Sequence, residues 1–155
     1  MKVSPTIKSN RYNRIYEQLK ELVVITDNRI ARMATIAALL HHKMKSFSWT
    51  GFYLLSDGDL IVGPYQGRLA CQVLEKNCGV CWEGINEEKI IIVPDVHKFP
   101  GHIACDPKSR SEIVIPLRDR QNKKTGVLDV DSEIIGNFDE TDSEYLEKIV
   151  RLVYL

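Results

Sequence analysis

Apolar residues recur at three- and four-residue spacing in two stretches near the start of the chain, within residues 12–23 and 30–44. That spacing places them on one face of a helix and predicts two amphipathic helices, over about residues 10–45. The polar residues 26–28 interrupt the pattern and offer a side-chain cap for the second helix. A closing helix is predicted over about residues 141–154, because a Thr-x-x-Glu capping box at its start precedes an apolar stripe.

From residue 48 onward the pattern changes to short runs of β-branched and aromatic residues separated by turn signals. A Ser-Asp-Gly-Asp turn lies between the first two runs, and its Asp-Gly pair is typical of a hairpin. The predicted strands cover residues 49–55, 60–67, 69–74, 89–96, 112–117 and 126–132. The polar connection over residues 97–111 has a length that is typical of a functional loop.

The order of these elements predicts the architecture. Two helices, then strands that follow one another as a meander, then a closing helix indicate an α+β fold. We expect a central antiparallel sheet with the N-terminal and C-terminal helices packed on one face. A chain of this length predicts a single domain over residues 1–155, with the sheet and its loops over about residues 48–132.

Charge is balanced over the whole chain but not along it. The 155 residues carry 21 Lys and Arg against 21 Asp and Glu, and zero net charge disfavours a polyanionic or membrane-surface partner. Residues 1–50 hold nine basic and three acidic side chains, a net charge of +6, so the remaining residues carry −6. The chain has neither a signal-peptide core nor a run of roughly 18 apolar residues, which predicts a cytoplasmic protein.

Four cysteines lie between residues 71 and 105, and their grouping allows more than one chemistry. In a reducing compartment, clustered cysteines indicate redox chemistry or metal binding more often than structural disulfides. Cys78 and Cys81 form a CxxC motif, which suits a redox pair that opens a helix, one half of a zinc site, or buried apolar thiols. Cys105 needs a neighbouring donor or cation to act as a nucleophile, and His102 is a candidate.

A second group of chemistry-bearing residues is acidic. Asp129 and Asp131 alternate with Leu128 and Val130, so both carboxylates lie on one face of the predicted strand. If that face is solvated, they are ordinary surface groups; if it is buried, they are costly. Glu112, which begins the preceding predicted strand, would complete a cluster in which mutual repulsion raises one pKa. Such a cluster binds an ammonium group and donates a proton.

Short motifs with compatible spacing follow one another along most of the chain. They are WxGFY at residues 49–53, GPYQGxxAC at 63–71, GVC at 79–81, PDV at 94–96, GHIACD at 101–106, SEIVxP at 111–116 and GVLDVDS at 126–132. Each motif is weak alone. In this order, over roughly residues 12–154, they resemble the free methionine-(R)-sulfoxide reductases, which are single-GAF-domain enzymes.

The resemblance implies an activity and parts for three cysteines. The family reduces free L-methionine (R)-sulfoxide, and not the peptide-bound form, through a cysteine sulfenic acid and an intramolecular disulfide. It has no bound cofactor or metal, and thioredoxin is the external reductant. Cys105 matches the attacking nucleophile and Cys71 a resolving cysteine. Cys81 matches a third family cysteine, to which a catalytic or a resolving part is assigned.

The resemblance also implies the composition of the substrate pocket. Trp49 and Tyr53 match aromatic residues that hold the methyl-sulfoxide end. Glu112, Asp129 and Asp131 match the acidic group that binds the substrate and assists protonation. This chemistry agrees with the residues themselves, because a sulfoxide oxygen leaves only when protonated and a free amino acid presents an ammonium group.

Some residues depart from the family pattern. Cys78 stands where the family does not normally carry a cysteine, and it would allow a competing disulfide with Cys81 or Cys71. Trp82 and Glu83 replace residues that are usually small. The alternative function is a non-catalytic GAF-type module that binds or senses a small ligand, which would need no redox cysteines. A homodimer is a further expectation, since GAF domains commonly dimerise through helices.

Overall fold

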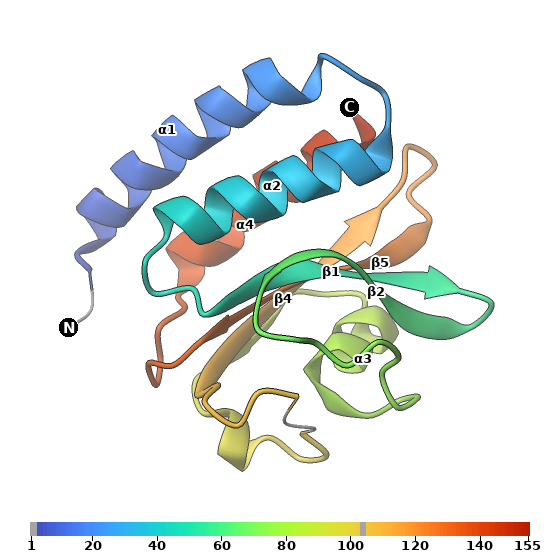
Figure 1. Cartoon of the computed structure of the whole chain (residues 1–155). Coiled ribbons are helices and arrows are strands. Elements are labelled where there is room, and N and C mark those ends of the chain that lie inside the picture. Colours follow the sequence, from blue (N-terminus) through green and yellow to red (C-terminus); the bar gives the residue numbers. More distant parts are fainter. Residues whose placement is uncertain (1–2, 103–104) are drawn as a thin grey trace.

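The computed structural model describes residues 3–102 and 105–155 and contains one sheet with helices on both of its faces (Figure 1). The helices are α1 (Pro5–Val23), α2 (Arg29–Lys43), α3 (Gly79–Glu87) and α4 (Glu140–Val150), with the 3-10 turns η1 (Val96–Lys98) and η2 (Arg151–Tyr154). The strands are β1 (Trp49–Ser56), β2 (Asp59–Gly67), β3 (Ile91–Val93), β4 (Ser111–Arg118) and β5 (Lys124–Ser132). The prediction of an α+β fold is confirmed.

The sheet is antiparallel, as predicted, and its strand order is β2-β1-β5-β4-β3. The prediction of a simple meander is wrong, because β1 pairs with β5 and β2 does not pair with β3. The chain leaves the sheet at one edge after β2 and returns at the opposite edge as β3. Residues 68–90 therefore cross one face of the sheet, and α3 lies within this crossing (Figure 1).

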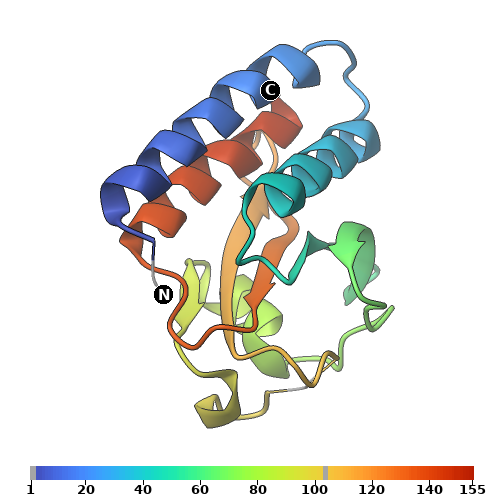
Figure 2. The same cartoon turned by 60° about the vertical axis from the view of Figure 1, so that its left-hand side comes forward.

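Helices α2 and α4 pack on the other face of the sheet, as predicted, and α1 packs against α2 and α4 (Figures 1 and 2). Their apolar stripes meet strand side chains such as Phe52, Ile113 and Leu128, which are completely buried. Burial of one such side chain stabilises the fold by about 1.5–3 kcal/mol. Among the described residues, no helix combines the length and the hydropathy that a membrane crossing requires.

Strand β5 alternates between the two faces of the sheet in the predicted way. Leu128 and Val130 belong to the apolar core beneath the three helices. Val127 belongs to a second apolar cluster on the opposite face, and Asp129 and Asp131 line a cavity there. The face crossed by residues 68–90 therefore carries carboxylates among apolar side chains.

Several predicted boundaries are wrong. Helix α1 begins at Pro5 rather than near residue 10, because a proline suits the first turn of a helix. The predicted strand over residues 69–74 contributes only one isolated bridge, at Val73. The predicted strand over residues 89–96 pairs only along the three residues of β3, since the following Pro94 has no N–H to donate.

Side chains cap the helices, in part where the sequence predicts. Asn28 caps α2, within the polar break expected to do so. Helix α4 starts from a capping box of Asp139 and Asp142, and the predicted box of Thr141 and Glu144 is wrong. The reason is that Asp139 accepts the N–H groups of Thr141 and Asp142, while the Asp142 carboxylate accepts the N–H of Asp139.

A buried charged contact joins the first and last helices. Lys8 Nζ lies 2.6 Å from Asp142 Oδ2 and 2.9 Å from Asp139 Oδ2. The Tyr12 hydroxyl donates a hydrogen bond of 2.7 Å to Asp142 Oδ1. Burial raises the pKa of Asp142, although the hydrogen bonds from Lys8 and Tyr12 act in the opposite direction. The carboxylate of Asp142 therefore depends on these two partners to remain inside the protein.

We expect Lys8→Met to lower the free energy of unfolding by about 3–5 kcal/mol, because it leaves a buried carboxylate without its cation. Urea denaturation followed by circular dichroism measures this loss. Lys20→Met is the matched control, since Lys20 pairs with Glu17 at 2.9 Å on the surface of the same helix and should cost far less. Equal losses in the two variants would contradict the importance of the buried contact.

Candidate active site

A cavity of about 60 Å³ lies on the sheet face opposite α1, α2 and α4. Strands β1, β4 and β5 form its floor, and α3 with two connecting segments forms its walls. Seven of the eight site residues predicted from the sequence line this cavity: Trp49, Tyr53, Cys81, Cys105, Glu112, Asp129 and Asp131. The eighth, Cys71, is covalently joined to one of the seven.

Cys71 and Cys105 form a disulfide, with Cα atoms 5.8 Å apart. They are separated by 34 positions in the sequence, so the fold and not the local chain brings them together. The bond joins the segment that follows β2 to the segment that precedes β4. Two further cysteines are free, namely Cys78, which is half-buried, and Cys81, which is buried.

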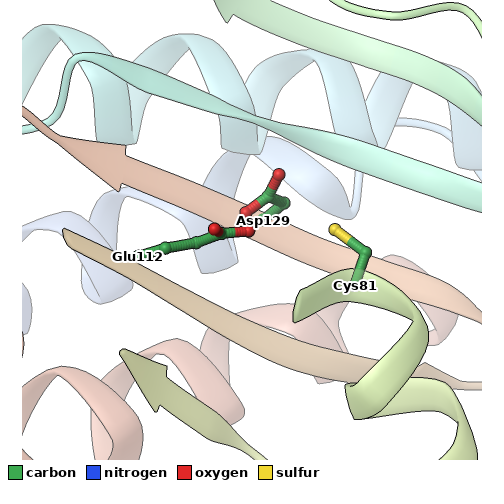
Figure 3. A group of neighbouring side chains, drawn as sticks. All are labelled: Cys81, Glu112 and Asp129. Atoms are coloured by element: carbon green, nitrogen blue, oxygen red, sulfur yellow. The ribbon is translucent and has the colours of Figure 1, made fainter. Parts of the chain in front are cut away.

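The three predicted carboxylates gather on neighbouring strands. Glu112 on β4 lies directly opposite Asp131 on β5, and Asp129 is two residues away on the same face. Glu112 and Asp129 are only 5% and 6% exposed, so this face is buried and not solvated. Figure 3 shows the carboxyl groups of Glu112 and Asp129 meeting beside the thiol of Cys81. One ligand atom from each of the three lies within 4.8 Å of the other two.

Burial perturbs the protonation of these acids. It raises the pKa of Glu112 and of Asp131 well above the usual range, and the charge of Asp129 adds to the effect. Burial raises the pKa of Asp129 to about 6, while hydrogen bonds from Glu112 and Cys81 favour its charged form. Ser109 Oγ donates a bond of 2.9 Å to Asp131 Oδ1. At neutral pH the cluster therefore holds at least one proton.

Cys81 differs from the disulfide cysteines in its surroundings. Burial and the adjacent carboxylates raise the pKa of its thiol well above the usual value. The protonated thiol hydrogen-bonds to Asp129. Because a thiolate is the reactive form of cysteine, this environment makes Cys81 a poor nucleophile at neutral pH.

Aromatic side chains form the apolar wall of the cavity. Trp49 stacks on Tyr53 and Tyr65, with ring centroids 5.7 and 5.2 Å away. Trp49 Nε1 donates to the carbonyl oxygen of Arg68 at 3.1 Å, and the Tyr53 hydroxyl donates to that of Cys71 at 3.0 Å. The two aromatic residues thus hold the segment that carries one cysteine of the disulfide.

Two glycines make this aromatic stack sterically feasible. A Cβ on Gly51 would lie 2.3 Å from Tyr65 Cβ, which is too close for any other residue. Gly67 has a φ of +122°, and a Cβ there would lie 2.8 Å from Trp49 Cδ1. The glycines in the WxGFY and GPYQG motifs are therefore required by the packing of Trp49.

The sequence did not indicate some of the residues that complete the site. Ser109 holds Asp131, and Arg68 Nη1 lies 3.3 Å from Asp106 Oδ1 next to the disulfide. The only signal for Ser109 was its place in the long polar connection, and Asp106 was noted only as the end of the GHIACD motif. Their partners come from β5 and from the end of β2, which local sequence does not reveal.

His102 lines the cavity beside the acids. Its Nδ1 lies 4.0 Å from Glu112 Oε2, and its buried Nε2 has no hydrogen-bond partner among residues 3–102 and 105–155. Burial, with a smaller contribution from His97, lowers the pKa of His102 and favours the neutral imidazole. His102, the candidate donor to Cys105, therefore lies against the carboxylate cluster as a neutral imidazole.

Cys81, Glu112 and Asp129 are also close enough together to be considered as ligands of a metal ion. Their polar atoms already form hydrogen bonds with one another through Asp129. This group contains one cysteine of the CxxC motif and lacks Cys78. It is therefore a different arrangement from the zinc site that the motif suggests.

The fold and the site agree with a known class of protein. The family model described as GAF domain matches residues 30–153. GAF domain-containing protein A of Dictyostelium discoideum is 42% identical over 154 residues, which cover 99% of this chain and 96% of that protein. The chain is thus a GAF-domain protein.

Two further relatives narrow this class. The free methionine-R-sulfoxide reductase of Escherichia coli is 38% identical over 143 residues, which cover 92% of this chain and 86% of that enzyme. A solved structure of the free methionine-R-sulfoxide reductase from Neisseria meningitidis, in complex with its substrate, is 36% identical and superposes with a TM-score of 0.90. That match covers 95% of this chain and 88% of the other. The chain belongs to the free methionine-R-sulfoxide reductase family.

The buried acids should make stability depend on pH in a specific way. The pKa of Asp129 is about 6 in the folded protein and near 3.8 when unfolded, so the folded state binds more protons between these values. The contribution of Asp129 to stability therefore falls as the pH rises from about 4 to 6. Asp129→Asn lacks this loss, and its stability relative to the wild type should rise with pH over the same window.

Thermal denaturation at several pH values measures this difference. Asp59→Asn is the control, because Asp59 is an exposed residue at the start of β2. A wild-type and an Asp129→Asn protein whose stabilities run parallel from pH 4 to 6 would show that Asp129 titrates normally.

Proposed function

We propose that this protein reduces free L-methionine (R)-sulfoxide to L-methionine with its own cysteines. The observation that carries the proposal is a disulfide-forming pair, Cys71 and Cys105, beside a buried carboxylate cluster in a single cavity. Reduction of a sulfoxide requires both parts, since a thiol supplies the electrons and an acid protonates the departing oxygen. Membership of the reductase family supports the same assignment.

The cluster divides into a charged and a protonated part. Asp129, with a pKa of about 6, carries a negative charge at neutral pH and attracts the substrate's ammonium group. Glu112, with its pKa raised well above the usual range by burial, keeps a proton for the sulfoxide oxygen. Neighbouring carboxyl groups whose pKa values are pushed apart commonly take separate acid and charge-binding parts in this way.

The remaining parts of the substrate meet the apolar wall. The methyl and methylene groups of a methionine side chain suit the stacked faces of Trp49 and Tyr53. A peptide-bound methionine sulfoxide has an amide in place of the ammonium and gains nothing from Asp129. The same carboxylates that bind the free amino acid therefore exclude the peptide.

The chemistry proceeds in two steps, an oxidation of Cys105 by the substrate and a condensation with Cys71. The Cys105 thiolate attacks the sulfoxide sulfur, the oxygen is protonated and transferred, and methionine leaves with Cys105 as a sulfenic acid. The Cys71 thiol then attacks that sulfur, water leaves, and the Cys71–Cys105 disulfide forms. The structure shows the protein with this disulfide in place.

An external dithiol returns the enzyme to its reduced form. We assign this part to thioredoxin, because thiol–disulfide exchange with a dithiol regenerates both cysteines in two steps. The half-buried Cys71 and the 88% exposed Leu69 place one sulfur of the bond close to the surface. All electrons come from thiols, so the reaction needs no bound cofactor and suits the reducing cytoplasm.

The exposed apolar residues between the first two helices support self-association. Val24 and Ile25 directly follow α1 and are 61% and 78% exposed. Ile30 lies at the start of α2 and is 65% exposed. An exposed apolar patch is typical of protein contacts, and these three side chains are candidates for one. It suits a homodimer that forms through helices.

A coupled assay tests the proposed activity. Thioredoxin, thioredoxin reductase and NADPH are combined with the protein, and NADPH oxidation is followed with free methionine (R)-sulfoxide, its (S) epimer and an N-acetylated (R) form. We expect turnover of the free (R) form and little or none of the other two. Absence of turnover with the free (R) form would leave the non-catalytic ligand-binding function as the better account.

A single-turnover experiment tests the parts of the cysteines. We expect Cys105→Ser, incubated with substrate but without reductant, to release no methionine, because the attacking sulfur is missing. Cys71→Ser is the matched control, which should release methionine and accumulate a sulfenic acid that dimedone traps. Release of one methionine per chain by Cys105→Ser would show that another cysteine is the nucleophile.

A further inference from the structure

The reaction described above leaves two cysteines of the cavity, Cys78 and Cys81, without a part. Cys78 lines the cavity together with Cys105, and it is half-buried while Cys81 is buried. Cys78 also lines a second hollow of about 290 Å³, next to Phe99 and Gly101. This residue therefore lies between the closed cavity and the outer surface.

Cys71 and Cys78 belong to one short connecting segment over the sheet. Among the residues between them the structure has no helix or paired strand, only an isolated bridge at Val73. A turn in which the Cys78 N–H donates to the carbonyl oxygen of Glu75 at 3.2 Å folds the end of this segment back on itself. Cys78 can therefore approach Cys71 by movement of a few residues, without unpairing the sheet.

The junction next to Cys78 is loosely packed around Gly79. Gly79 has a φ of +84°, and no atom lies within 4 Å of the position that a Cβ would occupy there. Cys78 is the N-cap residue of α3, but within the described part of the chain its side chain makes no capping hydrogen bond. Of the two free cysteines, Cys78 is the more accessible one, because it is half-buried while Cys81 is buried beside the carboxylates.

We propose that Cys78 is a second resolving cysteine, which displaces Cys105 from the Cys71–Cys105 disulfide and pairs with Cys71. The Cys78 thiolate attacks Cys71 Sγ, the Cys71–Cys78 bond forms, the Cys71–Cys105 bond breaks, and Cys105 leaves as a thiolate. Cys78 is oxidised and Cys105 is reduced, so the exchange needs no further oxidant or reductant. The proton lost by Cys78 passes to solvent.

This exchange, which rests on the proposed function, has two consequences. It moves the disulfide from the cavity to the segment at its outer rim, where an external dithiol attacks more easily. It also restores the nucleophile before any reductant has acted. The protein can then reduce a second molecule of sulfoxide, which leaves Cys105 as a sulfenic acid.

The number of methionines released without reductant tests the exchange. Fully reduced protein is mixed with excess free methionine (R)-sulfoxide, and methionine is quantified by chromatography until release stops. We expect two methionines per chain from the wild type and one from Cys78→Ser. Glu83→Gln is the matched control, because Glu83 lines the same outer hollow but carries no sulfur, and it should release two.

Tryptic mapping of the disulfides gives an independent result. The chain has Lys or Arg at positions 68, 76, 89, 98 and 108, so trypsin separates three cysteine peptides, residues 69–76, 77–89 and 99–108. After turnover of the wild type, we expect 69–76 to be linked to 77–89. In Cys78→Ser we expect 69–76 to be linked to 99–108.

The outcomes separate the two proposals. One methionine from both wild type and Cys78→Ser, with 69–76 linked to 99–108 in each, would overturn the exchange and leave the reductase function intact. A disulfide confined to residues 77–89 would also overturn it, because Cys78 would then pair with Cys81. No methionine from the wild type would overturn the reductase function itself.

Discussion

The burial of acidic side chains on one face of the β4–β5 pair is the constraint on which the rest of the site depends. Glu112 and Asp131 face each other across the two strands, with Asp129 beside them, and water is largely excluded. A buried carboxylate is costly, and the protein lowers that cost by keeping protons and by hydrogen bonds. The carboxyl groups thus keep a proton close to the reactive cysteines because the chain covers this face of the sheet.

The covering segment and the helical face have separate tasks. Helices α1, α2 and α4 supply most of the apolar core and anchor the sheet from one side. On the other side, residues 68–90 close over the acids and bring Cys71 to Cys105. Trp49 and Tyr53 fasten this segment to β1 through two hydrogen bonds. The helical face therefore stabilises the sheet, while the face crossed by residues 68–90 carries the reactive groups.

Local patterns predicted those parts of the molecule that depend on local physics. The helical stripes, the β1–β2 hairpin and the alternation of β5 all follow from spacing within one element. The pairing of β1 with β5 could not be predicted in this way, because nothing near either strand specifies a partner about 75 positions away. The α4 cap was misplaced by two positions although it is local, because Asp139 and Thr141 are both residue types that cap helices, and Lys8 from α1 pairs with the two carboxylates of the actual box.

The candidate site shows the same division. Alternation put Asp129 and Asp131 on one face but could not decide whether that face was buried, since the crossing by residues 68–90 decides it. Motif resemblance brought Cys71, Cys105 and the aromatic pair into one site. It did not indicate Ser109, which reaches Asp131 from a distant connection.

The most direct test of this account is the protonation state of the acid cluster in the reduced enzyme. Carbon NMR of the carboxyl groups, recorded from pH 3 to 9, follows each titration in the wild type and in Glu112→Gln. We expect a carboxyl group that still carries its proton at pH 7 in the wild type and whose signal is lost in Glu112→Gln. If Glu112, Asp129 and Asp131 all titrate near the usual value of about 4, the cluster holds no proton and the account is wrong.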